Sequence, residues 1–253
     1  MSTTIAIAHL KGGVGKTLTA ANVGAALARA GHPTLLVDLD PTGSLSAYWL
    51  GEEADEVEIT IYDALSSQQR IQPTAVQKRL DLLPAHDELA AAEIELAHMV
   101  EKDGQSVGQY RLAQVLGTSY TDYTYHVIDC PPGLGILSIN ALVAADLLII
   151  PCKPELSAQR SLRRMYRTID AVKQKDNPQL QVKWILPTLF DIRKAHHKEV
   201  LRALHEIYPG AVYAEASRET TKYNDAWTEG IDISSLDKRL GQYWDRFAAS
   251  ITT

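Results

Sequence analysis

The sequence predicts an α/β fold, with a mostly parallel twisted sheet and helices on both of its faces. Short apolar runs alternate with longer helical patterns along the 253 residues, which is typical of strand–helix–strand units. The run Leu147–Ile150 is continuously apolar, as expected of a strand buried on both faces. No internal repeat or low-complexity linker divides the chain. We therefore expect a single domain over residues 1–253.

Each predicted element follows from this alternation. The expected strands are Ile5–His9, Thr34–Val37, Leu80–Leu83, Tyr125–Ile128, Leu147–Pro151, Val182–Leu186 and a weaker one near Ala211–Tyr213. The expected helices include Thr17–Ala30, Ser138–Ala145, Leu156–Lys175 and His197–Tyr208. In such sheets ligands bind beyond the carboxyl ends of the strands. Functional residues should therefore directly follow strands.

Composition and charge narrow the class of protein. The 45% hydrophobic and 22% charged fractions are ordinary for a soluble globular protein. No apolar run approaches the roughly 18–20 residues of a membrane span, and the N-terminus has no basic leader, so we expect a cytoplasmic protein. Cys130 and Cys152 adjoin apolar runs and are expected to be reduced and buried. The net charge of −6 excludes a generally basic nucleic-acid binder, so DNA contacts would need a local patch.

A glycine-rich loop follows the first predicted strand and opens the first helix. It reads Lys11-Gly12-Gly13-Val14-Gly15-Lys16-Thr17. Its glycines let successive N–H groups curl around phosphate oxygens, and the helix N-terminus adds a positive dipole. Lys16 is placed to reach the β- and γ-phosphates, and the Thr17 hydroxyl to bind Mg²⁺. Leu10 occupies the first glycine position of the ordinary P-loop pattern, which is therefore only partly matched.

Two acidic segments follow later strands. Asp38 and Asp40 emerge from the second strand at i and i+2 and point the same way, towards the phosphate end of the sheet. Asp129 ends the strand Tyr125–Ile128, where a buried carboxylate is costly unless it is paired or near a cation. A carboxylate that holds Mg²⁺ supplies such a reason. The alternatives are a helix-capping Asp40-Pro41 turn and a structural aspartate at 129.

The loop K-G-G-x-G-K-[ST] resembles the signature of the deviant Walker A ATPases, the family of ParA, MinD and the nitrogenase iron protein. The resemblance implies one P-loop NTPase domain that uses ATP and Mg²⁺, and a Lys11 that crosses a dimer interface to assist catalysis. It also implies that Asp40 orients the attacking water and that Asp38 and Asp129 support the Mg²⁺ shell with Thr17. Thr42 departs from the glutamine usual in that acidic loop. The predicted nucleotide-binding residues are Lys11, Gly12, Gly13, Val14, Gly15, Lys16, Thr17 and Leu18, with Lys11, Lys16 and Asp40 as catalytic residues.

The resemblance covers most of the chain and is strongest to short ParA-like partition ATPases. No extension precedes the first strand, so we expect the form without an N-terminal operator-binding domain. The resemblance implies a homodimer that forms with ATP, binds DNA without sequence preference and lies on the nucleoid. A ParB-like or cargo adaptor protein would stimulate its slow ATP hydrolysis. The cargo would be a plasmid, a chromosome or another intracellular body.

Basic residues gather in the C-terminal half, including Arg160, Arg163, Arg164 and Arg167 on one predicted helix. The resemblance places Arg193 and Arg218 near the DNA-contacting arginines of the family. The predicted DNA-binding residues are Arg164, Arg193, Lys194, Arg218 and Lys222. The alternative is a solvated basic face that also contains Asp191 and Glu199. The family motif I-P-R reads Ala216-Ser217-Arg218 here, which weakens the match at that loop.

Three alternative functions remain at this stage. A MinD-like membrane switch would use the C-terminal helix, where Leu236, Leu240, Trp244, Phe247 and Ile251 recur at helical spacing. Its polar face mixes both charges, which favours core packing and no membrane contact. A metabolic P-loop enzyme would need a second substrate pocket. An electron-transfer ATPase would need cluster-ligating cysteines, for which Cys130 and Cys152 give poor support.

Overall fold

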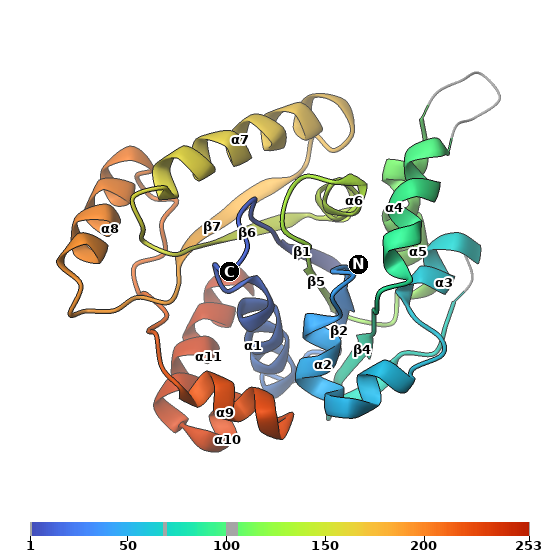
Figure 1. Cartoon of the computed structure of the whole chain (residues 1–253), viewed down its shortest axis with the longest axis horizontal. Helices are drawn as coiled ribbons and strands as arrows, with labels where there is room; N and C mark the ends of the chain where they lie inside the picture. The colour runs from blue at the N-terminus through green and yellow to red at the C-terminus, as the bar shows by residue number, and fades with distance from the viewer. Residues whose placement is uncertain (1, 68–69, 100–105, 253) are drawn as a thin grey trace.

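A seven-stranded sheet runs through the middle of the molecule (Figure 1). The computed structural model describes residues 2–67, 70–99 and 106–252. The strand order is β3-β4-β2-β5-β1-β6-β7, and β3 is antiparallel to β4 while the other neighbours are parallel. The strands are β1 (Thr3–Ile7), β2 (Thr34–Asp38), β3 (Thr74–Gln77), β4 (Leu80–Leu83), β5 (Tyr125–Asp129), β6 (Leu147–Cys152) and β7 (Gln181–Pro187).

Helices cover both faces of this sheet (Figure 1), which confirms the predicted fold class. One face carries α1 (Lys16–Arg29), α2 (Ser44–Leu50), α9 (Lys222–Glu229), α10 (Ile233–Leu236) and α11 (Lys238–Thr252). The other carries α3 (Ile61–Ser67), α4 (Leu89–His98), α5 (Arg111–Ser119), α6 (Ile136–Ala144), α7 (Ala158–Lys175) and α8 (Ala195–Ile207). Short 3₁₀ turns are η1 (Gly51–Glu56) and η2 (Gly108–Tyr110).

The core consists of two apolar layers, one on each side of the sheet. Side chains alternate across β1: Ile5 and Ile7 pack with α1 and α11, whereas Ala6 packs with the opposite layer. All three are fully buried. Burial on both faces explains why the central strands read as continuous apolar runs.

The strands predicted at β2, β4, β5, β6 and β7 agree with the observed ones within a residue or two. The first predicted strand, Ile5–His9, is observed two residues earlier as β1. The edge strand β3 was not predicted, because its residues are half-buried or exposed and form no apolar run. The prediction of a weak strand near Ala211–Tyr213 was also wrong. Val212 makes only an isolated bridge to Ile185.

The C-terminal helix α11 packs into the core, as predicted. Trp244 and Phe247 are fully buried, and Ile251 is nearly so, in the layer shared with α1. The apolar side of α11 is therefore already covered by protein. Among the described helices, none combines the length and the apolar character that a bilayer crossing requires.

Candidate nucleotide site

The carboxyl ends of β1, β2 and β5 meet at one edge of the sheet. Asp129, the last residue of β5, lies opposite Ile7 of β1 on one side and Asp38 of β2 on the other. The glycine-rich loop leaves β1 at this edge and leads into α1. The sheet therefore brings together three segments that lie far apart in the sequence.

The glycine-rich loop is shaped to receive an anion. Gly13 and Gly15 have φ angles of +70° and +85°, which L side chains rarely adopt. A Cβ at Gly12 or Gly13 would meet nothing within 4 Å, so space remains beside the loop. No hydrogen bond among the described residues uses the N–H groups of Gly12, Gly13 or Gly15. Together with the first turn of α1, these donors are available to phosphate oxygens.

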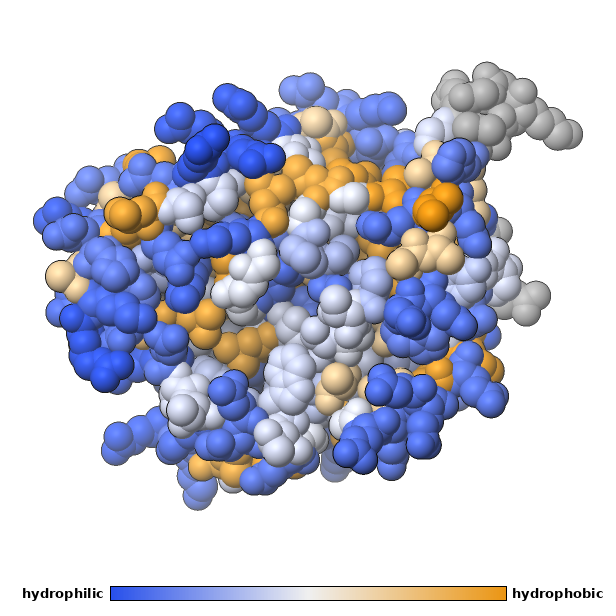
Figure 2. All heavy atoms as spheres, in the orientation of Figure 1, coloured by the Kyte–Doolittle hydropathy of each residue, from blue (hydrophilic) through white to orange (hydrophobic). Residues whose placement is uncertain are grey.

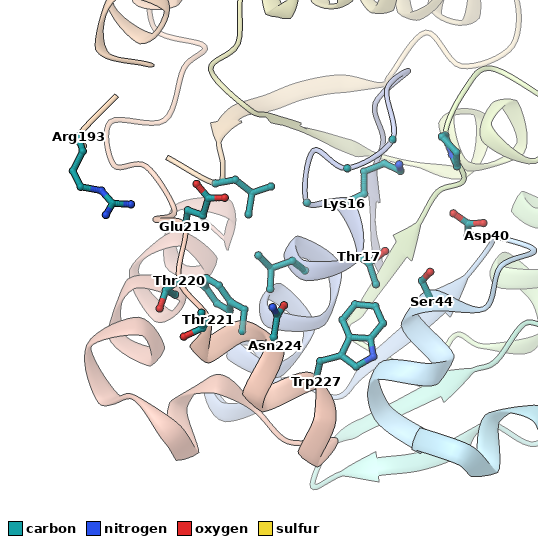
Figure 3. A pocket seen from close by; sticks show the side chains of 17 residues that line it. Lys16, Thr17, Asp40, Ser44, Arg193, Glu219, Thr220, Thr221, Asn224 and Trp227 are labelled. Atoms are coloured by element: carbon teal, nitrogen blue, oxygen red, sulfur yellow. The ribbon is translucent and has the colours of Figure 1, made fainter. Parts of the chain in front are cut away.

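A cavity of about 720 Å³ opens over this loop. Lys16, Thr17 and Leu18 line it from α1, and Asp40 and Ser44 line it from the segment after β2. Figure 3 shows Lys16 and Thr17 facing Asp40 across the cavity. Lys16 is buried, and none of the ion pairs among the described residues includes it. A buried ammonium without a carboxylate partner is suited to an anionic ligand.

Asp129 is fully buried, and neither of its carboxylate oxygens has a hydrogen-bond partner among the described residues. Burial, followed by the charge of Asp38, raises the pKa of Asp129 well above its usual range. The nearby Thr17 hydroxyl and Lys16 ammonium act in the opposite direction. An unsatisfied buried carboxylate is costly in the absence of a cation. Its chemistry fits a divalent metal ion.

Asp38 is also fully buried, but its oxygens are occupied. Ser46 donates to Oδ2 from its backbone N–H at 2.9 Å and from its hydroxyl at 2.8 Å. The backbone N–H of Asp40 donates to Oδ1 at 3.1 Å. Burial raises the pKa of Asp38 to about 7, against the hydrogen bonds from Ser46. Asp38 thus fixes the start of the acidic loop through these hydrogen bonds. Its support of a Mg²⁺ shell stays a prediction.

Asp40 lies further along the same loop and is almost buried. Its Oδ1 accepts hydrogen bonds from the N–H and the hydroxyl of Thr42, at 3.0 and 2.9 Å. No described hydrogen bond uses Oδ2, so one oxygen can face the cavity. Thr42, which departs from the family glutamine, therefore orients Asp40 within its own loop.

The donor set suits Mg²⁺ bound largely through water and phosphate. No cluster of three or more His, Cys, Asp or Glu in the described part of the chain could hold a metal ion by itself. Mg²⁺ commonly uses one or two carboxylates, retained waters and substrate phosphates. Thr17 and Asp129 would provide the protein side of such a site.

Lys11 lies outside the cavity that its own loop forms. Its Nζ contacts Glu155 Oε2 at 2.5 Å and the Ser157 hydroxyl at 3.3 Å. Lys153 contacts the other oxygen of Glu155 at 3.1 Å. Lys11 and Lys153 lower the pKa of Glu155 to about 2. The ammonium of Lys11 is therefore held on the surface, 47% exposed, beside the start of α7.

The far wall of the cavity was not predicted from sequence. It consists of Leu189 and Arg193 after β7 and of Glu219, Thr220, Thr221, Tyr223, Asn224 and Trp227 at α9. Thr188 connects this wall to the glycine-rich loop, because its hydroxyl donates to the Val14 carbonyl at 2.6 Å. Trp227 stacks edge-on with Tyr48, with ring centroids 5.4 Å apart, and its indole rises towards Thr17 (Figure 3). No local motif marks these residues.

The predicted DNA-binding residues do not form one group. Arg193 makes a bidentate ion pair with Asp191, and Lys194 contacts Glu219 at 3.2 Å. Lys222 pairs with Asp237. Arg164 and Arg218 are exposed and have no ion pair among the described residues. They lie apart, on α7 and on the segment before α9.

The site defines a P-loop nucleotide-binding protein. It combines a phosphate-binding loop, a buried lysine without an ion pair and neighbouring carboxylates at the carboxyl edge of a parallel sheet.

Residues 2–182 match the family model described as an AAA domain. The chain is 41% identical over 213 residues to the chromosome partitioning protein ParA of Myxococcus xanthus (strain DK1622), covering 83% of this chain and 72% of that protein. It is 36% identical to the sporulation initiation inhibitor protein Soj of Bacillus subtilis (strain 168), covering 94% and 93%.

A solved structure of cobyrinic acid a,c-diamide synthase from Mycobacterium smegmatis, with bound ATP analog and magnesium, is also similar. Its TM-score is 0.78 and its identity 35%, over 90% of this chain and 92% of that one. The chain therefore belongs to the ParA/Soj family of partition ATPases, within the AAA-domain family.

Proposed function

We propose that this protein is an ATP-driven switch that dimerises with ATP and Mg²⁺, binds DNA without sequence preference and thereby positions a cargo. A partner protein on the cargo, of the ParB-like or adaptor kind, would stimulate hydrolysis and return the dimer to monomers. The partition proteins among its relatives support the general role. The cargo is a plasmid, a chromosome or another intracellular body.

The position of Lys11 carries this proposal. A lysine next to a phosphate loop would ordinarily be expected to face the loop's own ligand. Lys11 instead lies outside its own cavity, on the surface, in a solvent-accessible ion pair. A lysine held there is available to the nucleotide of a second subunit, where it would neutralise phosphate charge as an arginine finger does. Catalysis would then require the dimer.

The other roles follow from the cavity. Lys16 and the free N–H groups of the loop bind the phosphates, and Asp40 orients the attacking water with its unoccupied oxygen. Thr17 and Asp129 would hold Mg²⁺, with Asp38 in support. When bound, the ion neutralises phosphate charge. Exchange of ATP for ADP would change the contacts of the Asp40 loop and of the Pro131-Pro132-Gly133 loop that follows Asp129.

An amide-forming synthetase is the main metabolic alternative, because one similar structure bears such a name. A chain that released ammonia from glutamine by itself would need a reactive thiolate. Cys130 and Cys152 are both buried, and burial raises the pKa of Cys152 to about 12 and that of Cys130 further. Neither is suited to that step. The partition function needs no such nucleophile.

The deciding experiment is a DNA-binding titration with ATP, with ADP and without nucleotide, at low and at higher salt. We expect binding only with ATP, equal for unrelated sequences and weakened by salt. A Lys16→Ala variant controls for nucleotide dependence. If DNA does not bind in any nucleotide state, the DNA part of the proposal is wrong. The ATPase assignment would not be affected.

A further inference from the structure

Helix α7 carries a charge opposite to that of the whole protein. It contains six Lys or Arg residues and one Asp, a net charge of +5, in a chain of net charge −6. Figure 2 shows strongly hydrophilic side chains along the upper edge of the molecule, where α7 runs in Figure 1. The local basic patch that an acidic DNA-binding protein needs is therefore present on this helix.

Four arginines form a stripe along α7, at positions 160, 163, 164 and 167. Their spacing of three or four residues places them on one side of the helix. The opposite side is anchored by Leu162, Met165 and Ile169, which are buried in the core. The stripe spans about 10 Å, at about 1.5 Å per residue. A duplex presents about six phosphates over that length, at one charge per ~1.7 Å.

These arginines are free of carboxylates. Within the described part of the chain, none of the side chains of Arg160, Arg163, Arg164 and Arg167 forms an ion pair or a hydrogen bond. Arg218 before α9 shares this property, but Lys194 and Lys222 do not. Lys194 and Lys222 contact Glu219 and Asp237. A cation that already has a carboxylate partner must lose that partner, or share it, in order to bind a phosphate.

We propose that the α7 arginine stripe is the main surface through which the protein binds the DNA backbone. This inference rests on the proposed function and names the surface that serves it. Guanidinium groups bind phosphate oxygens through two parallel N–H donors, and such contacts read no sequence. A lipid or peptide surface would instead need exposed apolar anchors. Within α7 none of the described residues is an exposed large hydrophobic side chain, and Leu156 precedes its first turn.

The test compares two double variants that remove equal charge. The first is Arg163→Gln with Arg167→Gln. Arg160 and Arg164 are left unchanged because they line a hollow next to Lys11. The matched control is Lys194→Gln with Lys222→Gln, whose ammonium groups are paired. DNA affinity is measured for each with ATP over a series of salt concentrations. The melting temperature checks that each variant is folded.

Each phosphate contact contributes about 0.9 to the slope of log affinity against log salt. Because the α7 variant lacks two arginines, we expect the magnitude of that slope to fall by about two per subunit. Its affinity at low salt should fall at least tenfold, and the control should change less than threefold. An Arg163→Lys, Arg167→Lys variant should retain most of the affinity, which tests the stripe without removing charge. Equal losses in the two charge-removing variants, or a loss in the control alone, would overturn the stripe as the binding surface. Failure of the unaltered protein to bind DNA with ATP would instead overturn the proposed function.

Discussion

The hydroxyl of Ser46 connects the acidic loop to the core, and its removal should be costly. It donates to Asp38 Oδ2 at 2.8 Å and accepts from the backbone N–H of Ala85 at 2.9 Å, and all three groups are buried. In Ser46→Ala a hydrogen bond to a carboxylate is lost, worth about 1.5–3 kcal/mol, and the Ala85 N–H is left unpaired at about 1–3 kcal/mol. Because Asp38 keeps two backbone donors, we expect the variant to be about 3 kcal/mol less stable.

Urea unfolding at pH 8 measures this free energy, with Ser44→Ala as the matched control. Ser44 lies two residues earlier, and the one hydrogen bond of its hydroxyl among the described residues is with the exposed hydroxyl of Thr42, at 3.0 Å. The control should change stability by less than about 0.5 kcal/mol. If Ser46→Ala costs no more than Ser44→Ala, the buried network around Asp38 does not stabilise the loop, and the reasoning fails.

Four further predictions follow from the site. Lys16→Ala should weaken ATP binding at least tenfold, because the phosphates lose a charged hydrogen bond; calorimetry that finds unchanged affinity would contradict the phosphate role. Asp40→Ala should slow hydrolysis and prolong the ATP dimer, as seen by sedimentation with a turnover assay; normal turnover would remove Asp40 from the mechanism. Glu155→Gln should release Lys11 from an exposed ion pair worth about 0.2–1 kcal/mol, and tighten ATP dimerisation up to about fivefold; a weaker dimer would argue against transfer of Lys11 to a partner. Burial lowers the pKa of His9 from 6.5 to about 4. As the pH falls, His9 therefore becomes protonated in the unfolded chain before it does so in the folded protein. The free energy of unfolding should fall as the pH drops from 6.5 towards 4, by about 2 kcal/mol at pH 5. His9→Gln should reduce that loss in urea titrations, and an identical pH profile would exclude His9 as its source.

The sequence predicted the phosphate side of the site because its signals are local. The residues from Lys11 to Leu18 are contiguous, and Asp40 and Asp129 each follow a strand that reads clearly as apolar. The carboxyl ends of parallel strands share one edge, so these segments had to meet. The edge strand β3 could not be found in this way, because a half-buried strand of four residues has no continuous apolar run.

The opposite wall of the cavity depends on contacts between distant parts of the chain. Thr188 reaches Val14 across 174 positions. Trp227 packs on Tyr48, which comes from another helix on the same face of the sheet. No propensity or motif within either segment specifies that contact. The sequence could therefore indicate which segments form the loop side of the cavity but not which side chains enclose the rest of it.

The basic residues show a second limit of sequence reasoning, since a count of cations does not say which are free. Arg193 could have been paired with Asp191 from their spacing alone, but the partners of Lys194 and Lys222 are 25 and 15 residues away. The arginines of α7 are recognisable in the sequence by their helical spacing, but the fold is needed to show that no carboxylate of the described residues pairs with them. Ion pairing within the subunit therefore reorders the predicted DNA contacts: it favours Arg164 and its neighbours on α7 over Arg193, Lys194 and Lys222. On the proposed function, an acidic protein would bind DNA through the free cations on one helix, whatever its net charge.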